Sequence, residues 1–199
     1  MFQLLLVDDE ANVVDSLADT LPWETIGIGA VFKAYSGGEA LEILETNTID
    51  ILMSDIRMPG MNGLELLAQV RRKWKKVKFI LLSGHAEFKY AQEAVGHGLF
   101  GYLLKPISDR DVLSHVESAV EVLRKERDEM FSYQSAVQTF QENLPKLRNE
   151  LLSDLLQGYK FAPGRLREKM DSLQITAEEG EPFALLLVRV EGEWVQLDF

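Results

Sequence analysis

The first 106 residues predict an α/β fold built on a doubly wound, five-stranded parallel sheet. Two observations carry this prediction: strand-like and helix-like segments alternate, and each strand-like run is short and almost continuously apolar. Strands covered by helices on both faces have this composition, and the alternation gives parallel strands joined by right-handed crossovers. The expected strands are residues 3–7, 29–34, 49–54, 77–83 and 99–104, and the expected helices lie near 10–20, 37–46, 63–74 and 86–97.

From Ser108, a suitable N-cap, the pattern changes to one long helix. Positions spaced alternately by three and four residues predict a coiled-coil-like seam in which seven of ten side chains are apolar. The seam consists of Leu113, Val116, Val120, Leu123, Arg127, Met130, Gln134, Val137, Gln141 and Leu144. Packing of this helix on its own domain is the alternative to pairing of two chains. We expect Pro145 to interrupt the helix.

After this break the sequence predicts helices at 147–158 and 163–173 and a buried-type strand at 183–191. A single strand cannot form a hydrophobic core, so we expect an incomplete α/β region that is truncated in this chain. The expected division is therefore an α/β domain at 1–122, a linker helix and possible coiled coil at 123–144, and the start of a further domain at 145–199.

The composition excludes several classes of function. The 199 residues contain no cysteine, which excludes disulfides, thiolate metal sites and a cysteine nucleophile, and fits a reducing cytosol. The chain shows neither a signal peptide nor an apolar run that could span a bilayer, so we expect a cytoplasmic protein without a membrane partner. The net charge is −11, with −6 in residues 1–120 and −5 in residues 121–199, so charge does not favour nucleic-acid binding by this stretch.

Polar residues follow four of the predicted strands. Asp8 and Asp9 follow the first, Asp55 ends the third, Ser83 ends the fourth and Lys105 follows the fifth. Open parallel sheets place their functional groups at the carboxyl ends of the strands. The sequence therefore predicts a site in which acids, a hydroxyl and an amine converge on one crevice.

Three carboxylates at neighbouring strand ends repel each other unless a cation lies between them. Mg²⁺ suits such a site because it is hard, prefers oxygen ligands and keeps several waters. We expect Asp9 and Asp55 to bind Mg²⁺ directly, Asp8 to act partly through water, and the backbone carbonyl of Arg57 to complete the shell.

A carboxylate in this setting is a competent nucleophile toward a phosphoryl group. The transferring group spreads negative charge over its equatorial oxygens, which Mg²⁺, the Lys105 ammonium and the Ser83 hydroxyl would meet. Pro106 would fix the loop that holds Lys105, and a cis Lys105–Pro106 bond is compatible with this role.

Four segments that carry these residues resemble the receiver domain of two-component response regulators. They are LLLVDDE (4–10), MSDIRMPGMNG (53–63), LLSGH (81–85) and GYLLKP (101–106). The resemblance covers about the first 120 residues and implies a flavodoxin-like receiver in which a partner sensor histidine kinase phosphorylates Asp55.

The resemblance also assigns roles to the other residues of the site. It implies that Asp8, Asp9 and Asp55 bind Mg²⁺ and that Lys105 contacts the phosphoryl group. It further implies a switch pair made of Ser83 and Tyr102, in which the hydroxyl moves toward the phosphoryl group and the aromatic ring swings inward. The face formed by the fourth helix, fifth strand and fifth helix would then change.

Residues 22–28, 83–95 and 144–158 resemble regulators that end in an AraC-type helix-turn-helix domain. No recognition helix follows in this chain, so DNA binding and control of transcription through a homodimer are implied for a parent protein only.

A Mg²⁺-dependent phosphohydrolase with an aspartyl-phosphate intermediate is the rival function. Those enzymes commonly carry an acid two residues after the nucleophile, where this chain has Arg57, so we expect a signalling switch and not an enzyme. Autophosphorylation from small donors and autodephosphorylation are the reactions that such a switch can show. A constitutive interaction module with a vestigial pocket is a third alternative.

Overall fold

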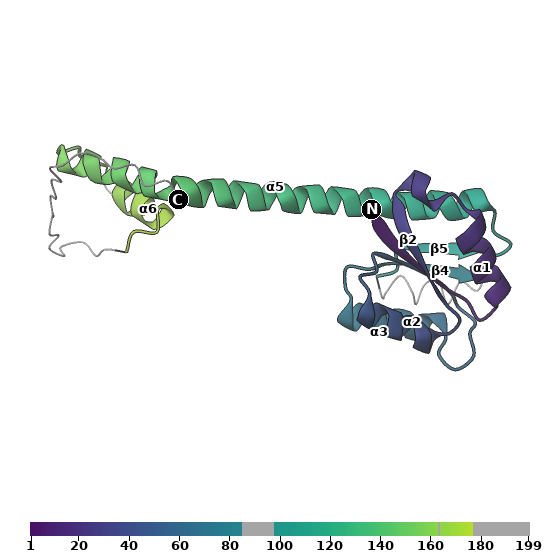
Figure 1. Ribbon diagram of the computed structural model, residues 1–199. Helices are drawn as coiled ribbons and strands as arrows, with labels where there is room; N and C mark the ends of the chain where they lie inside the picture. The colour runs from purple at the N-terminus through teal and green to yellow at the C-terminus, as the bar shows by residue number, and fades with distance from the viewer. Residues whose placement is uncertain (85–97, 163, 177–199) are drawn as a thin grey trace, which may run out of the picture. The chain divides into compact units, whose positions relative to one another are not determined.

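The computed structural model describes residues 1–84, 98–162 and 164–176. Figure 1 shows the ribbon of the chain. Its core is a five-stranded sheet in the order β2-β1-β3-β4-β5, and all neighbouring strands are parallel. The strands are β1 (Phe2–Val7), β2 (Ile28–Ala34), β3 (Ile51–Asp55), β4 (Lys78–Ser83) and β5 (Gly101–Leu104). This topology confirms the predicted doubly wound, flavodoxin-like fold.

The helices are α1 (Ala11–Thr20), α2 (Gly37–Thr46), α3 (Gly63–Lys73), α5 (Asp109–Leu156) and α6 (Arg165–Ser172), with a 3₁₀ turn η1 (Trp23–Ile26). The helix predicted near 86–97 and the strand predicted at 183–191 lie outside the described residues. Among the helices that the structure describes, none combines the length and the apolar character needed to cross a membrane. The chain divides into two compact units, Met1–Ser132 and Tyr133–Phe199.

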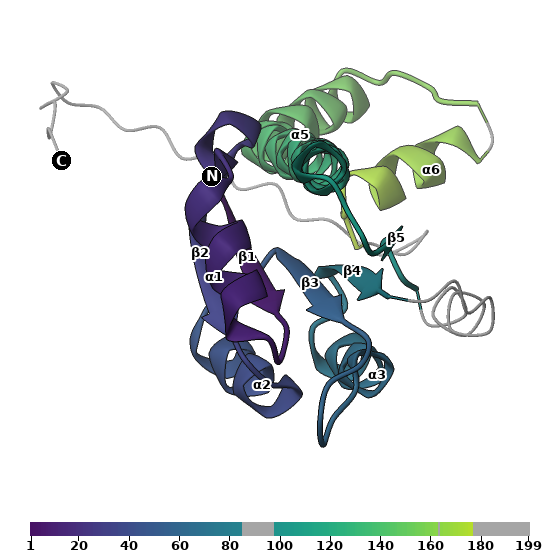
Figure 2. The same ribbon diagram turned by 90° about the vertical axis from the view of Figure 1, so that its right-hand side faces the viewer.

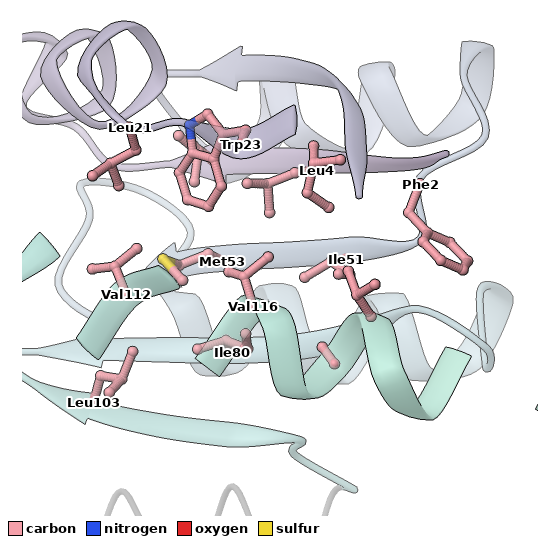
Figure 3. Packing of buried hydrophobic residues seen from close by; sticks show 14 of the residues in the cluster. Phe2, Leu4, Leu21, Trp23, Ile51, Met53, Ile80, Leu103, Val112 and Val116 are labelled. Atoms are coloured by element: carbon pink, nitrogen blue, oxygen red, sulfur yellow. The ribbon is translucent and has the colours of Figure 1, made fainter. Parts of the chain in front are cut away.

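Successive strand residues point to opposite faces of the sheet and build two separate cores. On one face Leu4, Met53 and Ile80 pack against α1 and the first turns of α5, and Figure 3 shows this layer. On the other face Leu5 and Phe79 pack against α2 and α3. Helices therefore cover both faces of the sheet (Figure 2), which explains why the strands read as continuous apolar runs.

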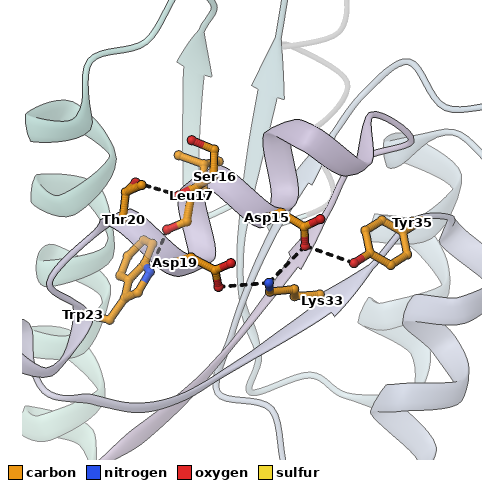
Figure 4. Close-up of polar contacts among 8 residues, drawn as sticks. All are labelled: Asp15, Ser16, Leu17, Asp19, Thr20, Trp23, Lys33 and Tyr35. Atoms are coloured by element: carbon orange, nitrogen blue, oxygen red, sulfur yellow. Dashed lines mark hydrogen bonds and ion pairs between the residues drawn. The ribbon is translucent and has the colours of Figure 1, made fainter.

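A polar network joins the edge strand β2 to α1 (Figure 4). The Lys33 ammonium lies 3.0 Å from an Asp15 carboxylate oxygen and 2.9 Å from one of Asp19, and the Tyr35 hydroxyl donates to Asp15. The Trp23 indole N–H donates to a backbone carbonyl of α1. Since the ion pairs are exposed, they contribute little stability and mainly orient β2 against the helix.

The first half of α5 corrects the predicted seam. Val116 and Val120 are fully buried against the sheet, and Leu113 and Leu123 pack partly buried against the same core. At Val116 and Val120 the helix therefore packs on its own domain, which was the alternative, and the prediction that these two side chains pair with a second chain is wrong. Sequence spacing alone cannot separate the two cases, because a sheet and a partner helix both select one apolar face.

The predicted interruption at Pro145 is also wrong, because α5 continues through it to Leu156. A proline in a helix removes one hydrogen bond to the carbonyl four residues earlier and crowds that carbonyl. Packing on either side of Pro145 offsets this cost, since Leu144 and Leu151 are both buried in the core of the second unit. The helix predicted at 147–158 is thus the end of α5, and the helix predicted at 163–173 is confirmed as α6.

The second unit has a small core formed between the end of α5 and α6. Leu144, Leu151 and Leu173 are its buried members. The Arg148 guanidinium donates to the Leu173 carbonyl at 2.8 Å and to the Gln174 carbonyl at 3.1 Å. These bonds satisfy carbonyls at the carboxyl end of α6, where a cation also favours the helix dipole.

Candidate functional site

Strand register brings the predicted site residues to one edge of the sheet. Val7 of β1 lies opposite Ser54 of β3, so the next residues, Asp8 and Asp55, lie at the same level. Asp55 in turn lies opposite Leu82 of β4. β1 and β3 are the strands at which the chain changes direction across the sheet, which is the switch point where open α/β sheets bind ligands.

Lys105 joins the two buried carboxylates of this edge. Its ammonium nitrogen lies 2.7 Å from Oδ2 of Asp8 and 2.6 Å from Oδ1 of Asp55. Burial disfavours the charged ammonium, but the hydrogen bonds to Asp55 and Asp8 outweigh it and raise the pKa of Lys105. The lysine therefore remains a cation and holds both carboxylates in place.

The backbone of the β5 end aims Lys105 at the site. Its N–H donates to the carbonyl of Ser83 at 2.7 Å, which continues the pairing of β5 with β4 by one residue. The following Lys105–Pro106 peptide bond is cis, the form that the sequence allowed.

The loop after β3 fixes the other oxygen of Asp55. The backbone N–H of Arg57 donates to Oδ2 of Asp55 at 2.6 Å. The N–H of Gly63 donates to the carbonyl of Ile56 at 2.9 Å, which draws the first turn of α3 against the end of β3. A Cβ on Gly63 would collide with the backbone oxygen of Asp55, so only glycine permits this approach. Asn62 and Glu65 form a capping box that starts α3 at this point.

Asp8 and Asp9 differ in their surroundings. Asp8 is buried, and its Oδ1 accepts the backbone N–H of Glu10 at 3.0 Å while Oδ2 faces Lys105. Asp9 is exposed and lines a pocket of about 440 Å³ together with the loop after Asp55. The remaining lining residues are Ile56, Arg57, Met58, Pro59, Asn62 and Leu64. This pocket was not predicted from the sequence, although the loop MPGMNG next to Asp55 forms part of its lining.

The two residues of the predicted switch pair lie on adjacent strands. Ser83 is buried at the end of β4. Tyr102 is half-buried in β5, packs against the core on the α2 and α3 face, and pairs in register with Leu81. Ser83 pairs with Leu104, two residues further along β5. Tyr102 and Ser83 therefore lie on adjacent strands, offset by two residues.

The carboxylates at this edge are suitable ligands for a divalent cation, but they are not arranged as a ready-made metal site. Within residues 1–84, 98–162 and 164–176, no three Asp, Glu, His or Cys side chains are grouped closely enough to hold a metal ion. The Lys105 ammonium, between Asp8 and Asp55, is the cation present. Three carboxylates nevertheless outnumber that lysine, and all their donor atoms are oxygen, as Mg²⁺ prefers. Asp9, Asp55 and the carbonyl of Arg57 would hold the ion.

Comparison with known proteins identifies the domain that carries this site. Residues 4–117 match the response regulator receiver domain. The chain belongs to that family. Receiver domains generally bind Mg²⁺ at their acidic phosphorylation site. The predicted family is therefore confirmed, whereas the individual roles of the site residues remain predictions.

Relatives of this receiver domain are transcriptional and response regulators. The uncharacterized transcriptional regulatory protein YesN of Bacillus subtilis is 39% identical over 126 residues, which are 63% of this chain and 34% of that protein. The uncharacterized response regulatory protein SERP2406 of Staphylococcus epidermidis is 30% identical over 165 residues, 80% of this chain and 64% of that protein. This chain thus spans less than two thirds of the length of either relative.

Solved structures show the same receiver fold. The crystallised REC domain of AraT, a response regulator from Geobacillus stearothermophilus, superposes with a TM-score of 0.58 and is 34% identical. The match covers 63% of this chain and 98% of that domain. The AraT domain therefore corresponds to the N-terminal part of this chain.

Proposed function

We propose that this receiver domain accepts a phosphoryl group on Asp55 from the phosphohistidine of a sensor histidine kinase. The observation that carries the proposal is the contact of Lys105 with the carboxylates of both Asp8 and Asp55. In the reaction a carboxylate oxygen of Asp55 attacks phosphorus, the N–P bond breaks, and the released imidazole takes up a proton. The charge on the phosphoryl oxygens needs compensation, and a lysine already at 2.6 Å from Asp55 can supply it.

A bound Mg²⁺ would supply further positive charge next to the phosphoryl oxygens. Asp9, Asp55 and the backbone carbonyl of Arg57 would hold the ion directly, and Asp8 would contact it partly through water. The excess of carboxylates over cations at this edge and the general behaviour of the family support this assignment. When bound, the ion neutralises charge on a phosphoryl oxygen.

Ser83 and Tyr102 report phosphorylation to the rest of the domain. We infer that the Ser83 hydroxyl moves toward the phosphoryl group and that the Tyr102 ring then swings inward. Their positions on neighbouring strands and the incomplete burial of Tyr102 support this role. The change would reach the face that includes β5 and α5. The fourth helix of that face falls in residues 86–97, outside the described residues.

The output of the switch belongs to a longer protein. We propose that the parent protein acts in the cytoplasm and controls transcription as a homodimer through an AraC-type DNA-binding domain absent from this chain. The names of the relatives, which are transcriptional and response regulators, support this proposal. The resemblance of residues 144–158 to the linker of such regulators supports it as well.

Acetyl phosphate with Mg²⁺ tests the proposed phosphoacceptor directly. The intact mass of the wild-type chain should increase by one phosphoryl group, whereas Asp55→Asn should gain none. Asp15→Asn, which removes a half-exposed carboxylate in the middle of α1 that pairs with Lys33, is the matched control and should gain the group normally. Phosphorylation of Asp55→Asn to the wild-type extent would refute the proposal. Sustained release of phosphate from an ester would instead support the rival phosphohydrolase, which Arg57 argues against.

A further inference from the structure

The end of α3 and the turn that follows it carry a cluster of positive charge. Residues 71–78 contain six of the eleven basic side chains in residues 1–120 and no acidic one. The rest of residues 1–120 holds 17 acidic and five basic side chains, so the net charge of −6 conceals a basic region in an acidic domain. Arg72, Lys73, Lys75 and Lys76 are exposed, and we name these four residues the basic patch.

Carboxylates of the chain neutralise little of the basic patch. Lys73 pairs with Glu45 at 2.7 Å. Among the residues whose positions the structure describes, Arg72, Lys75 and Lys76 have no carboxylate partner. Like charges on one short segment repel each other, and an external anion relieves that repulsion. Three cations are therefore available to such a ligand.

The helix dipole accounts for only part of this charge. A helix dipole favours cations in the last turn, where Arg72 and Lys73 lie. Lys75 and Lys76 lie beyond the end of α3, in the turn that leads to β4. Because the dipole acts within about the last turn, it does not explain why these two residues are also basic.

The turn that carries Lys75 and Lys76 has a fixed shape. The half-buried Arg71 guanidinium donates to the Lys75 carbonyl at 3.3 Å and to the Val77 carbonyl at 2.6 Å. The N–H of Val77 donates to the carbonyl of Trp74 at 3.2 Å, and the Trp74 ring packs against the core between the sheet, α2 and α3. A surface that is already ordered loses less conformational entropy when it binds a ligand.

The composition of the basic patch favours a polyanion as its partner. Between residues 72 and 77 the apolar side chains are Trp74, which is half-buried, and Val77, which is buried. Protein interfaces have an apolar core, and helices that lie on membranes insert apolar side chains, but this surface offers neither. The backbone of duplex DNA presents a regular row of phosphates that lysine and arginine contact without apolar burial.

The basic patch lies far from the acidic phosphorylation edge. The 11 residues of α3 begin beside Asp55 and span about 16 Å, which is about two Debye lengths at physiological salt. The carboxylates at that edge are therefore largely screened from an anion at the patch. Lys78, which begins β4 at the patch end of the sheet, lies 2.6 Å from Glu126 of α5. The patch thus lies near the segment of α5 that leads out of the receiver unit, which ends at Ser132.

We propose that the basic patch binds the phosphate backbone of the duplex DNA that the parent protein holds. The inference rests on the proposed control of transcription, which supplies the DNA, and it gives the receiver domain a DNA contact of its own. Contacts with phosphates position a protein without reading sequence, so the patch adds affinity and leaves the choice of site to the output domain. The covalent link to that domain raises the effective concentration of DNA, so a weak contact is sufficient.

An NMR titration of the full 199-residue chain with a duplex of about 20 base pairs tests the proposal. The amide signals of residues 72–77 should shift at about 50 mM salt. Three to four phosphate contacts predict that Kd rises about 40- to 150-fold between about 50 and 200 mM salt.

Reversal of two charges tests the contribution of the turn. Lys75→Glu combined with Lys76→Glu should raise Kd about ten-fold or more, because it removes two phosphate contacts and adds repulsion. Arg110→Glu combined with Lys146→Glu is the matched control, since it makes the same charge change at exposed positions outside the patch. The control should change Kd less than about three-fold.

Three outcomes would overturn the proposal. The first is a wild-type chain whose amides at residues 72–77 do not shift with DNA at low salt. The second is a charge-reversed chain that binds DNA as tightly as wild type. The third is tighter binding to polyglutamate or to vesicles that contain phosphatidylserine, which would make an acidic protein or a membrane the partner.

Uptake of phosphate from acetyl phosphate, measured on the same samples, separates this inference from the proposed function. A chain that is phosphorylated on Asp55 but does not bind DNA contradicts the inference alone. A chain that binds DNA through residues 72–77 but takes no phosphate on Asp55 contradicts the proposed phosphoacceptor alone.

Discussion

The Lys105 ammonium lies 2.6 Å from Oδ1 of Asp55, and the same nitrogen lies 2.7 Å from Oδ2 of Asp8. One cation therefore holds two carboxylates that are 3% and 7% exposed as whole residues. Buried like charges without a counter-ion are costly, so the site depends on this lysine for stability as well as for the proposed chemistry.

Lys105→Met should lower the free energy of unfolding by about 2–3 kcal/mol, because Asp8 and Asp55 would remain buried without a cation. Urea denaturation without Mg²⁺ measures this change. Lys73→Met is the matched control, since it removes the exposed ion pair with Glu45 and should cost less than about 1 kcal/mol. Equal losses in the two variants would show that the contact with Asp8 and Asp55 adds no stability.

The pairing of Lys105 also predicts a dependence of stability on pH. The folded-state pKa of Lys105 is raised above its ordinary value of 10.5 because hydrogen bonds to Asp55 and Asp8 outweigh the effect of burial. The stabilisation is therefore fully present below pH 10.5 and is lost as pH rises through the higher folded-state pKa. The stability difference between wild type and Lys105→Met should stay constant from neutral pH to about pH 9.5 and shrink above pH 10.5. Urea titrations at several pH values measure it, and a difference that vanishes near pH 8 would contradict the assignment.

Asp9→Asn should abolish the stabilisation of the receiver domain by Mg²⁺ while leaving its stability without metal nearly unchanged. Asp9 is exposed, so its replacement removes a proposed ligand without disturbing the core. A ligand that binds only the folded state stabilises it by about 2.7 kcal/mol at a hundred times its dissociation constant. Urea midpoints with and without Mg²⁺ provide the measurement, and Asp19→Asn, another exposed acid, is the control. Equal Mg²⁺ effects in all three chains would remove Asp9 from the ligand set.

Gly63→Ala should lower the free energy of unfolding by about 1–3 kcal/mol and slow phosphorylation by acetyl phosphate about ten-fold or more. The added Cβ would collide with the backbone oxygen of Asp55, so the first turn of α3 and the phosphoacceptor must move apart. Gly38→Ala is the matched control because the nearest atom to its added Cβ, the Ser36 hydroxyl, lies 3.9 Å away. That variant should be neutral or slightly more stable, by about 0.5 kcal/mol. Normal phosphorylation of Gly63→Ala would show that the close approach of α3 does not position Asp55.

The sequence was sufficient to predict the sheet and its functional edge because both depend on order along the chain. Asp8 and Lys105 each follow a strand and Asp55 ends one, and in a parallel sheet all such positions meet at one side. That Lys105 contacts both carboxylates at once was not predictable, since it depends on side-chain geometry. The sequence also could not show what an apolar helix face packs against. Val116 and Val120 have the spacing of a dimer seam, but they pack on the sheet of their own domain.

Pro145 shows the same limit for local propensity. The expectation of a break rested on the lost hydrogen bond to the Gln141 carbonyl, which is a property of the chain itself. The burial of Leu144 and Leu151 on either side is a property of the second unit and outweighs it. Tertiary packing commonly overrides such preferences.

Pro145→Ala should therefore stabilise α5 and leave its course unchanged. Alanine restores the N–H that bonds to the Gln141 carbonyl and removes the ring that crowds it, so the free energy of local unfolding should rise by about 2 kcal/mol. Hydrogen exchange of the amides in residues 141–149 measures this quantity directly, and the protection should increase on both sides of position 145. Glu150→Ala, at an exposed position one turn further along α5, is the control and should change protection by less than about 0.5 kcal/mol. If Pro145→Ala left the exchange of these amides unchanged, α5 would be interrupted there in solution, and the packing of Leu144 and Leu151 would not be strong enough to hold the helix through the proline.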